Sequence, residues 1–463
     1  MVRESIELFF NKAILIFCTF LFIWLASMMI LFIFERMSQA NKLDKSYFGV
    51  IMEFKKVSVV GLGYIGLPTA AVIASRGIKV IGVDVSQHAV DTINAGNVHI
   101  VEPDLDMVVR SAVQAGNLKA TTRAEKADAF MVAVPTPFKE NYEADLSYIE
   151  SAAKTIAPVL EKGNLVILES TSPVGATEEL ANWLAESRPD LTFPQTHGSE
   201  ADINVAHCPE RVLPGHVLRE LVENDRVIGG MSEVCSKKAV ALYKTFVKGE
   251  CLLTNARTAE MAKLTENSFR DVNIAFANEL SMICDKLSID MWELIKLANR
   301  HPRVNILNPG PGVGGHCIAV DPWFIVSSAP DTAKLIRQAR EVNDSKPRYV
   351  LQQIIDAADQ FKKPVIACMG IAFKADIDDL RESPALDITK MLAQKSDAEV
   401  LVVEPNIETL PKVLSDLGVK LVTVEEALER CNTLAVLVDH KEFKNIAPEQ
   451  IAKKVIVDSR GIF

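Results

Sequence analysis

Short apolar runs separated by glycine turns and helical stretches are typical of parallel strands with crossover helices. We predict strands over residues 56–60, 79–84, 129–134 and 165–169, and a helix over residues 67–76. The last hundred residues repeat this pattern. A strand and turn at 363–370 is followed by a helix after Pro384 and by strands at 399–404, 434–438 and 455–458. The sequence therefore predicts two doubly wound α/β units.

Residues 254–298, between the two units, lack glycine and proline and have helical periodicity. Lys263, Asn267 and Arg270 fall on one face of this predicted helix. A polar stripe is ordinarily a solvated helix face. The apolar neighbours instead favour a largely buried helix, whose polar stripe would need a partner such as an anionic ligand. A helix of this length can also link two domains.

The N-terminal segment differs from the rest of the chain. Residues 13–34 carry no charge and are long enough to span a bilayer. The positive residues that follow them slightly outnumber those before, which would place the remaining chain in the cytoplasm. A second interpretation is a misassigned start, with Met52 as the true first residue. Both interpretations leave residues 1–51 outside the catalytic fold.

Composition narrows the functional classes. The hydrophobic content of 49% and charged content of 24% are those of a globular protein. A net charge of -10 without a basic tail argues against nucleic-acid binding. The eight cysteines are dispersed without a CxxC pair, which favours a reducing cytoplasm over a disulfide framework and predicts no metal site.

A glycine motif joins the first predicted strand to the first helix. Gly61, Gly63 and Gly66 form GxGxxG, and Asp84 ends the second strand. Such glycines let a dinucleotide pyrophosphate approach the helix N-terminus, and the carboxylate accepts from the adenosine ribose. No Arg or Lys follows Asp84 directly to receive a 2'-phosphate, so the motif favours NAD over NADP.

Hydroxyl-bearing turns follow the next two predicted strands. Thr136 comes after residues 129–134, and Thr171 after residues 165–169, with Thr177 further along. Carboxyl-end turns of a parallel sheet line the ligand site, so these threonines are cofactor-side candidates. A capping or turn role is the alternative for each of them.

A thiol lies on a glycine-rich loop. Four glycines and two prolines, from Pro309 onward, precede Cys317, and Asp321 follows it. An irregular backbone of this kind can present a thiol as a nucleophile, provided that its pKa is lowered. The alternative is a small buried hydrophobe, which is the common role of free cysteine.

These motifs together resemble the UDP-glucose/GDP-mannose dehydrogenase family over residues 52–463. The resemblance rests on their order: GLGYIG at Gly61, Pro209-Glu210-Arg211, the helix of Lys263 and Asn267, Gly315-His316-Cys317, and the segment Phe373-Lys374 to Arg381. Residues 301–305 and 315–323 look most like those of bacterial UDP-N-acetyl-D-mannosamine dehydrogenases.

The resemblance implies three domains and a homodimer or higher homo-oligomer. It divides the chain into an N-terminal extension (1–51), an NAD-binding Rossmann domain (52–253), a central helical dimerisation domain (254–350) and a UDP-sugar-binding Rossmann-like domain (351–463). It also implies a cytoplasmic enzyme of surface polysaccharide biosynthesis, for example of enterobacterial common antigen.

The implied activity is a four-electron oxidation of UDP-N-acetyl-D-mannosamine at C6, with two NAD reduced. A thiolate can trap the intermediate aldehyde as a thiohemiacetal, and the later thioester is hydrolysed. In this scheme Cys317 is the nucleophile, Lys263 moves protons and stabilises the oxyanion, and Asn267 positions the reactants. The resemblance assigns Asp321 to base or water-orienting work, with Glu210 and Thr171 in support.

The resemblance also assigns ligand contacts. Those to NAD are Gly61, Gly63, Tyr64, Ile65, Gly66, Asp84, Thr136, Thr177 and Arg381. Those to the UDP-sugar are Arg211, Val212, Lys263, Asn267, Arg270, His301, Arg303, Gly314, Phe373, Lys374 and Arg460. His301 and Arg303 would reach the substrate across a subunit boundary, or else belong to an ordinary polar loop.

One position departs from the family pattern. Glucose-type members carry a second glutamate four residues after the one that matches Glu210, and here that position is Pro214. This weighs against UDP-glucose as the substrate. UDP-N-acetylglucosamine is a further alternative within the family. A non-catalytic, membrane-tethered nucleotide-binding protein is an alternative of another class, but it would need neither Cys317, Lys263 nor Asp321.

Overall fold

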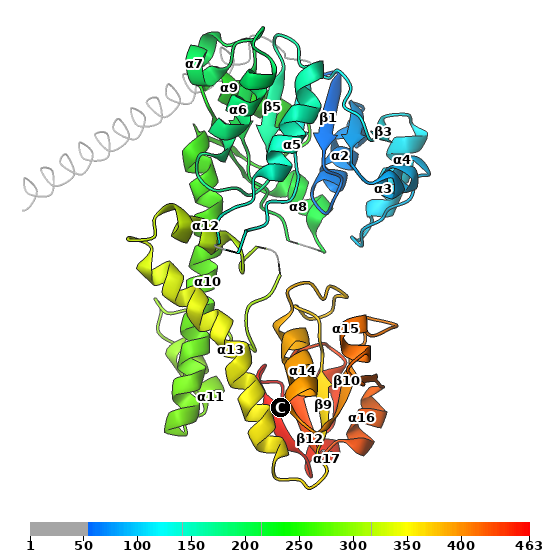
Figure 1. The fold of residues 1–463 in the computed structure, drawn as a ribbon, viewed down its shortest axis with the longest axis vertical. Helices are drawn as coiled ribbons and strands as arrows, with labels where there is room; N and C mark the ends of the chain where they lie inside the picture. The colour runs from blue at the N-terminus through cyan, green and yellow to red at the C-terminus, as the bar shows by residue number, and fades with distance from the viewer. Residues whose placement is uncertain (1–53, 141, 214, 316) are drawn as a thin grey trace, which may run out of the picture. The chain divides into compact units, whose positions relative to one another are not determined.

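Two sheets of mainly parallel strands organise the structure (Figure 1). This computed structural model describes residues 54–463 except 141, 214 and 316. The predicted membrane span at 13–34 and the alternative start at Met52 lie outside the described residues. Within the described part of the chain, no helix is long and apolar enough to cross a membrane.

The first sheet has eight strands in the order β3-β2-β1-β4-β5-β6-β7-β8. Neighbouring strands are parallel except for the β6–β7 pair. The strands are β1 (Lys56–Val60), β2 (Lys79–Val83), β3 (Leu118–Thr121), β4 (Ala129–Val132), β5 (Leu165–Leu168), β6 (Asn204–His207), β7 (Arg226–Gly230) and β8 (Cys251–Asn255). The order reverses between β1 and β4, and ligands of doubly wound sheets bind at such a switch point.

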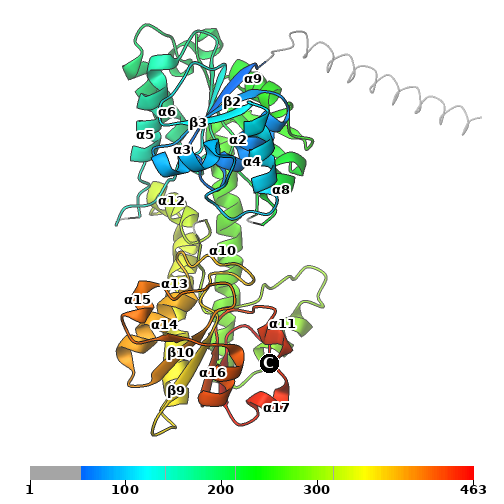
Figure 2. The ribbon, with the colours of Figure 1, turned by 90° about the vertical axis from the view of Figure 1, so that its right-hand side faces the viewer.

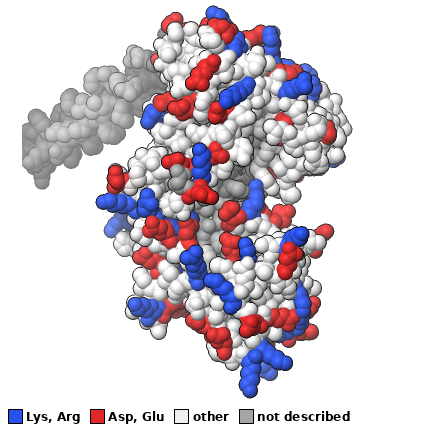
Figure 3. Space-filling model, in the orientation of Figure 1, with Lys and Arg blue, Asp and Glu red and all other residues white. Residues whose placement is uncertain are grey.

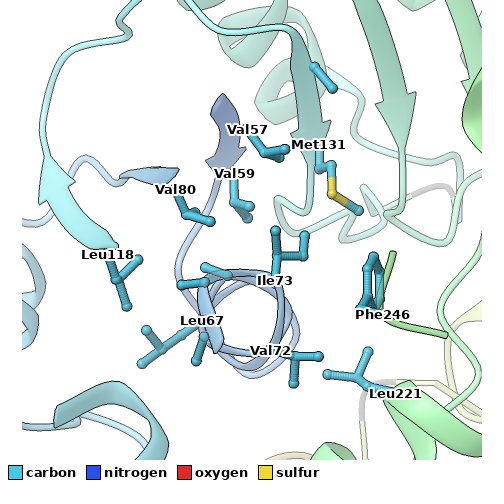
Figure 4. Close-up of a cluster of buried hydrophobic side chains, with 14 of the residues drawn as sticks. Val57, Val59, Leu67, Val72, Ile73, Val80, Leu118, Met131, Leu221 and Phe246 are labelled. Atoms are coloured by element: carbon cyan, nitrogen blue, oxygen red, sulfur yellow. The ribbon is translucent and has the colours of Figure 1, made fainter. Parts of the chain in front are cut away.

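Both faces of this sheet are buried, as expected for parallel strands with crossover helices. Val57 and Val59 pack with Leu67 and Ile73 of α2 on one face, where Figure 4 looks along the helix. Val60 belongs to a second core on the other face. The helices of this unit are α2 (Gly66–Ser75), α3 (Gln87–Asn94), α4 (Leu105–Gln114), α5 (Ser147–Ile156), α6 (Ala176–Ser187), α7 (Pro194–His197), α8 (Val217–Glu223) and α9 (Glu233–Tyr243), with 3-10 turns at Ala157–Val159 and Gly198–Glu200.

The second sheet is entirely parallel, in the order β11-β10-β9-β12-β13. Its strands are β9 (Val365–Met369), β10 (Glu399–Val403), β11 (Lys420–Leu421), β12 (Thr433–Val436) and β13 (Val455–Asp458). Its helices are α14 (Pro384–Lys395), α15 (Lys412–Ser415), α16 (Val424–Arg430) and α17 (Pro448–Ile451), with a 3-10 turn at Phe443–Asn445. The predicted fold class, two doubly wound Rossmann-like units with a long helix between them, is confirmed.

Four helices connect the sheets: α10 (Ala256–Leu287), α11 (Met291–Ala298), α12 (Asp321–Ser328) and α13 (Lys334–Ala358). Helices α10 and α13 pack side by side in both views (Figures 1 and 2). The C-terminal half of α13, including Val350 and Ile354, enters the core of the second unit. The predicted boundary at residue 350 therefore falls within a helix, and the one at residue 253 falls within β8.

The expectation of one helix over residues 254–298 is wrong in two respects. Thr254 and Asn255 end β8, and the Asn255 side chain caps α10 by accepting from Thr258 N. The helix then stops at Ser288, whose φ of 56 is left-handed. Asp290 accepts from the backbone N–H groups of Trp292 and Glu293 and starts α11. Local capping ended a run that periodicity alone would have continued.

Candidate active site

The glycine motif makes a tight turn that leaves the N-terminus of α2 open. A Cβ on Gly61, which has a φ of +90, would lie 2.6 Å from the Ala133 carbonyl oxygen, and one on Gly66 would lie 1.8 Å from that of Gly61. A Cβ on Gly63 would meet nothing within 4 Å. Ile65, the N-cap residue, makes no side-chain capping bond. Exposed N–H groups at a helix start suit a pyrophosphate.

Asp84 fastens this turn to the end of β2. Its Oδ2 accepts from Leu62 N at 2.8 Å and its Oδ1 accepts from Ser86 N at 2.8 Å. Val85, beside it, is 97% exposed, and no cation follows before Gln87. The turn, the open helix start and the carboxylate fit NAD, as the motif predicted.

Arg381 and Tyr64 come together although they lie in different units. The Arg381 guanidinium sits over the Tyr64 ring, 4.7 Å from its centroid, and its Nη2 pairs with Asp379 at 2.6 Å. Stacking of a guanidinium on an aromatic ring is favourable. Arg381 therefore lies beside the glycine turn, where its predicted contact with NAD is geometrically reasonable.

The three candidate threonines have different surroundings. The Thr136 Oγ1 is buried without a hydrogen-bond partner among the described residues, so it is available to a ligand. Thr171 is half-buried after β5. Thr177 is completely buried, and its hydroxyl donates to Glu260 Oε1 at 2.6 Å. Glu260 also accepts from the N–H groups of Gly175 and Thr177, which makes this pair a cap for α6.

The predicted catalytic residues of α10 and α12 converge. Lys263 and Asn267 are buried on α10, and Asp321 is buried at the start of α12. Asn267 Nδ2 donates to Asp321 Oδ2 at 2.5 Å. The Asp321 backbone N–H donates to the Cys317 carbonyl oxygen at 2.9 Å, so one turn of chain holds the carboxylate next to the thiol.

The thiol is protonated at neutral pH. Cys317 keeps exposed surface as a residue, but the protein around its sulfur desolvates the charged form and raises its pKa to about 11. The carboxylates of Asp321 and Glu210 raise this pKa, whereas the cations of Lys263 and Arg270 lower it. These four groups therefore act electrostatically on the sulfur, and formation of the thiolate needs a proton acceptor or an added positive charge.

Two carboxyls of the site titrate near neutrality. Burial raises the pKa of Asp321 to about 7 against the hydrogen bond from Asn267 and the charge of Lys263. Burial also raises the pKa of Glu210 to about 7, opposed by Lys263 and Arg226. The Glu210 carboxylate accepts from Val212 N, which fixes its side chain. A carboxyl with a pKa near 7 can serve as a general base at physiological pH.

The residues assigned to the UDP-sugar fall into two groups. Phe373 and Arg460 lie against the glycine loop: a Cβ on Gly315 would contact the Phe373 ring at 3.1 Å, and one on Gly310 would lie 2.6 Å from Arg460 Nη1. A Cβ on Gly314 would likewise lie 3.1 Å from Phe373 Cβ and 2.4 Å from the Glu382 carbonyl oxygen. Arg460 also pairs with Asp439 at 2.6 Å. A cation and an aromatic ring beside a glycine-rich backbone suit a nucleotide diphosphate.

The second group lies at the surface. Arg211 pairs with Glu266 at 2.7 Å and is followed by the half-buried Val212. Lys374, Arg270, His301 and Arg303 are exposed. The prediction that Lys263, Asn267 and Arg270 form one buried stripe is therefore wrong for Arg270, because the buried face of α10 continues through Ser268 and Asp271 and leaves Arg270 outside it. Pro214 lies outside the described residues.

Sequence reasoning missed two buried polar groups near the site. Glu169, after β5, accepts from the Tyr243 hydroxyl at 2.7 Å, and Arg226 lies over the Tyr243 ring at 5.9 Å. Asp271 and Arg340 form an ion pair of 2.6 Å between α10 and α13. Their partners are far apart in the sequence, so no local spacing points to them. The apolar residues of 334–358 recur with helical periodicity, and this signal could have predicted α13 from the sequence.

The charged side chains of the surface bear on the predicted absence of nucleic-acid binding. On the face in Figure 3, acidic and basic side chains are interspersed, without a large basic patch. The predicted absence of nucleic-acid binding remains a prediction, but it is consistent with this view.

Comparison with known proteins agrees with the geometry. Sequence profiles of the UDP-glucose/GDP-mannose dehydrogenase family match the chain in three parts: the NAD binding domain over residues 55–247, the central domain over 257–345 and the UDP binding domain over 367–463. An NDP-N-acetyl-D-galactosaminuronic acid dehydrogenase of Ralstonia nicotianae is 64% identical over 89% of this chain and 97% of its own. A UDP-N-acetyl-D-mannosamine dehydrogenase of Yersinia pestis is 63% identical over 89% of this chain and 100% of its own.

Solved structures show the same relationship. The UDP-D-ManNAc dehydrogenase of Pyrococcus horikoshii superposes with a TM-score of 0.79 at 39% identity, over 88% of this chain and 96% of that one. The Staphylococcus aureus enzyme Cap5O, a UDP-N-acetyl-mannosamine dehydrogenase, gives a TM-score of 0.78 at 41% identity, over 88% and 95%. These matches favour an enzyme over a nucleotide-sensing protein. The chain belongs to the UDP-glucose/GDP-mannose dehydrogenase family and is an NAD-dependent UDP-sugar dehydrogenase.

Proposed function

We propose that this enzyme oxidises UDP-N-acetyl-D-mannosamine at C6 to UDP-N-acetyl-D-mannosaminuronate. The observation that carries the chemistry is the convergence of Lys263, Asn267 and Asp321 beside the Cys317 loop. The sugar is supported by relatives from Yersinia pestis and Escherichia coli, 63% and 61% identical, that are named for this substrate.

NAD, when bound, would accept one hydride in each of the two oxidations, and Lys263 would take the proton that the C6 hydroxyl loses in the first. Cys317 adds to the carbonyl carbon of the aldehyde, its thiol proton passes to a nearby base, and Lys263 protonates the carbonyl oxygen, giving a thiohemiacetal. The second oxidation leaves a thioester on Cys317. Water then attacks the thioester and Asp321 accepts a proton from that water. The C–S bond breaks, and the Cys317 thiolate that leaves is reprotonated by the base that took the thiol proton earlier. Asn267 holds the Asp321 carboxylate in place through its 2.5 Å hydrogen bond.

The roles of Glu210 and Thr171 are supportive in this scheme. Glu210 lies close enough to Cys317 to raise the pKa of its thiol. Its own pKa of about 7 lets it exchange a proton during the cycle. Thr171 has a half-buried position after β5 and would orient the attacking water through its hydroxyl.

The dimer is supported by an apolar stripe on α10. Phe269, Phe276 and Ile283 recur every seven residues and are 68%, 56% and 44% exposed. Large apolar side chains repeated along one helix face mark a contact surface. A second copy on this stripe is the arrangement in which His301 and Arg303, exposed after α11, could contact the partner's substrate.

A panel of nucleotide sugars tests the proposal. Purified enzyme is supplied with NAD and each of UDP-N-acetyl-D-mannosamine, UDP-N-acetyl-D-glucosamine and UDP-glucose. We expect the mannosamine sugar to be oxidised fastest, with two NADH formed per acid. One NADH per sugar would contradict the four-electron route. A preference for UDP-glucose would contradict the substrate.

One comparison adds a fourth nucleotide sugar to this panel. The Ralstonia relatives, 64% identical, are named for N-acetyl-D-galactosaminuronic acid. UDP-N-acetyl-D-galactosamine therefore belongs in the panel, and its preferred oxidation would keep the mechanism while changing the stereochemistry of the substrate.

We also propose that the enzyme works in the cytoplasm for surface polysaccharide synthesis. The seven cysteines of the described part of the chain are all free, which suits a reducing compartment.

A further inference from the structure

A group of buried polar side chains joins α10 to α13 outside the catalytic set. Asp271 and Asn278 are 0% exposed on α10, and Arg340 and Asn343 are 1% exposed on α13. Buried polar groups are costly to desolvate, so the burial of four such side chains together needs a physical explanation. None of the four has a role in the chemistry proposed above.

The four side chains form one continuous hydrogen-bonded chain. Arg340 Nη1 donates to Asp271 Oδ1 at 2.6 Å. Asn343 Nδ2 donates to the same Asp271 oxygen at 2.8 Å. Asn278 Nδ2 donates in turn to Asn343 Oδ1 at 2.8 Å. The cluster Asp271–Asn278–Arg340–Asn343 is therefore a single polar unit between two long helices.

Asn278 and Arg340, the two ends of this cluster, hydrogen-bond to the backbone on either side of Cys317. Gly310 N donates to Asn278 Oδ1 at 2.9 Å, before the glycine run. Arg340 Nη1 donates to the Ile318 carbonyl oxygen at 3.4 Å, directly after Cys317. The two contacts bracket the loop on either side of the thiol. They come from helices whose own positions are fixed by packing.

The loop needs such support because of its composition. Gly312 and Gly315 have φ values of +153 and +80, conformations that side chains rarely adopt. Glycine is free to leave such conformations, so the loop sequence does not define its own path. A Cβ on Gly312 would lie 2.9 Å from Pro347 of α13, which shows how closely this helix backs the loop.

The cluster is poorly suited to a purely stabilising role. Arg340 Nε and Asp271 Oδ2 are buried and have no hydrogen-bond partner among the described residues. Buried ion pairs seldom stabilise more than apolar side chains of similar volume would, but they fix relative positions well. A positioning role accounts for the burial of these charges.

We propose that Arg340 is a positioning residue for Cys317: together with Asn278 it holds the backbone at Gly310 and Ile318, on either side of the thiol, against α10 and α13. The inference rests on the proposed role of Cys317 as the nucleophile. In this role, removal of the Arg340 guanidinium displaces the thiol. The glycine turn that precedes α2 keeps its structure, because Gly61 and Asp84 follow β1 and β2 of the first sheet, whereas Arg340 lies on α13.

The test compares Arg340→Met, Arg340→Lys and Asn278→Ala in the full-length chain. Leu392→Ala, in the core of the second unit, is the control for a general loss of stability. The readouts are kcat, the KM for NAD, the Tm and the rate of Cys317 alkylation by iodoacetamide across pH, followed on the Cys317 peptide by mass spectrometry. Asn278→Ala leaves no charge unpaired, so it keeps the test usable if Arg340→Met does not fold.

We expect Arg340→Met and Asn278→Ala to lower kcat by ~10- to 100-fold, as small misplacements of a reacting group do, with the KM for NAD within about twofold. The pH profile of Cys317 alkylation should change in both. Arg340→Lys, which keeps the charge but cannot reach Asp271 and Ile318 together, should recover part of kcat. The Leu392→Ala control should lose Tm without a change in the alkylation profile.

Wild-type kcat and an unchanged alkylation profile in these variants, with only a lower Tm, would overturn the positioning role. The alkylation readout needs no turnover. It therefore reports the position of the thiol even if Cys317→Ser retains acid formation, the result that would instead refute the nucleophile.

Discussion

Asn267 Nδ2 lies 2.5 Å from Asp321 Oδ2, and this hydrogen bond joins the middle of α10 to the first turn of α12. Both side chains are buried, and the carboxyl also interacts with Lys263 on the preceding turn of α10. The bond favours the charged form of the carboxylate against its burial. The protonation of Asp321 therefore depends on a residue of another element.

The pH profile of Asn267→Ala tests this relationship. Burial raises the pKa of Asp321 to about 7, and the Asn267 hydrogen bond opposes that rise. Loss of the bond should raise the pKa further, so the acid limb of the kcat profile should move to higher pH. Asn267→Ala is to be compared with the wild type from pH 5 to 9, with Asn445→Ala, at an exposed position of the second unit, as the control. An unmoved acid limb would show that a group other than Asp321 controls it.

Alkylation of the ligand-free enzyme tests the protonation of the thiol. Burial and the carboxylates of Asp321 and Glu210 raise the pKa of Cys317 to about 11. The rate of Cys317 alkylation by iodoacetamide should therefore still be rising at pH 9, because the thiolate is the reactive form. Quantifying the Cys317 peptide separates this thiol from the others. A plateau near pH 7 would contradict the high pKa.

The stability of Glu210→Gln should differ from the wild type in a pH-dependent way. The folded pKa of Glu210, about 7, lies above its unfolded value, so the folded state holds the proton more tightly. This contribution to stability is fully present below the unfolded pKa and is lost as the pH rises through about 7. The Tm of Glu210→Gln relative to the wild type should increase between pH 5 and pH 8. Glu223→Gln, on the surface of α8, is the control, and a constant difference for Glu210→Gln would refute the shift.

Gly63 and Gly66, in the glycine motif between β1 and α2, should respond differently to substitution by alanine. A Cβ on Gly63 meets nothing within 4 Å, whereas one on Gly66 would lie 1.8 Å from the Gly61 carbonyl oxygen. Gly63→Ala should keep the Tm but raise the KM for NAD about tenfold, since the added methyl occupies the approach of the pyrophosphate. Gly66→Ala should lower stability by ~1–3 kcal/mol through overpacking. Thermal melts and NAD titrations measure both, and equal behaviour of the two variants would contradict the assignment.

The site residues that could be predicted from the sequence are those that belong to short local motifs. Gly61, Asp84 and Cys317 stand in short motifs whose chemistry depends on neighbours in the chain, and the fold places them accordingly. Arg340 and Asn343 have partners on α10 about seventy residues away in the sequence, and only the packing of α10 on α13 brings them together. Arg270 shows the opposite limit, because helical spacing places it near Lys263 and Asn267 but does not say how far around α10 the covered face extends.

Phe276→Glu tests whether the apolar stripe of α10 is the dimer contact. Phe276 is 56% exposed at the centre of the stripe formed with Phe269 and Ile283, so a carboxylate there should separate the subunits without disturbing the core of either. We expect a monomer in analytical ultracentrifugation where the wild type is a dimer. If His301 and Arg303 complete the partner's substrate site, activity should fall together with the dimer. Leu335→Glu, which places the same charge on an exposed apolar position of α13, is the control. A fully active monomer would refute the shared site, and an unchanged dimer would place the contact elsewhere.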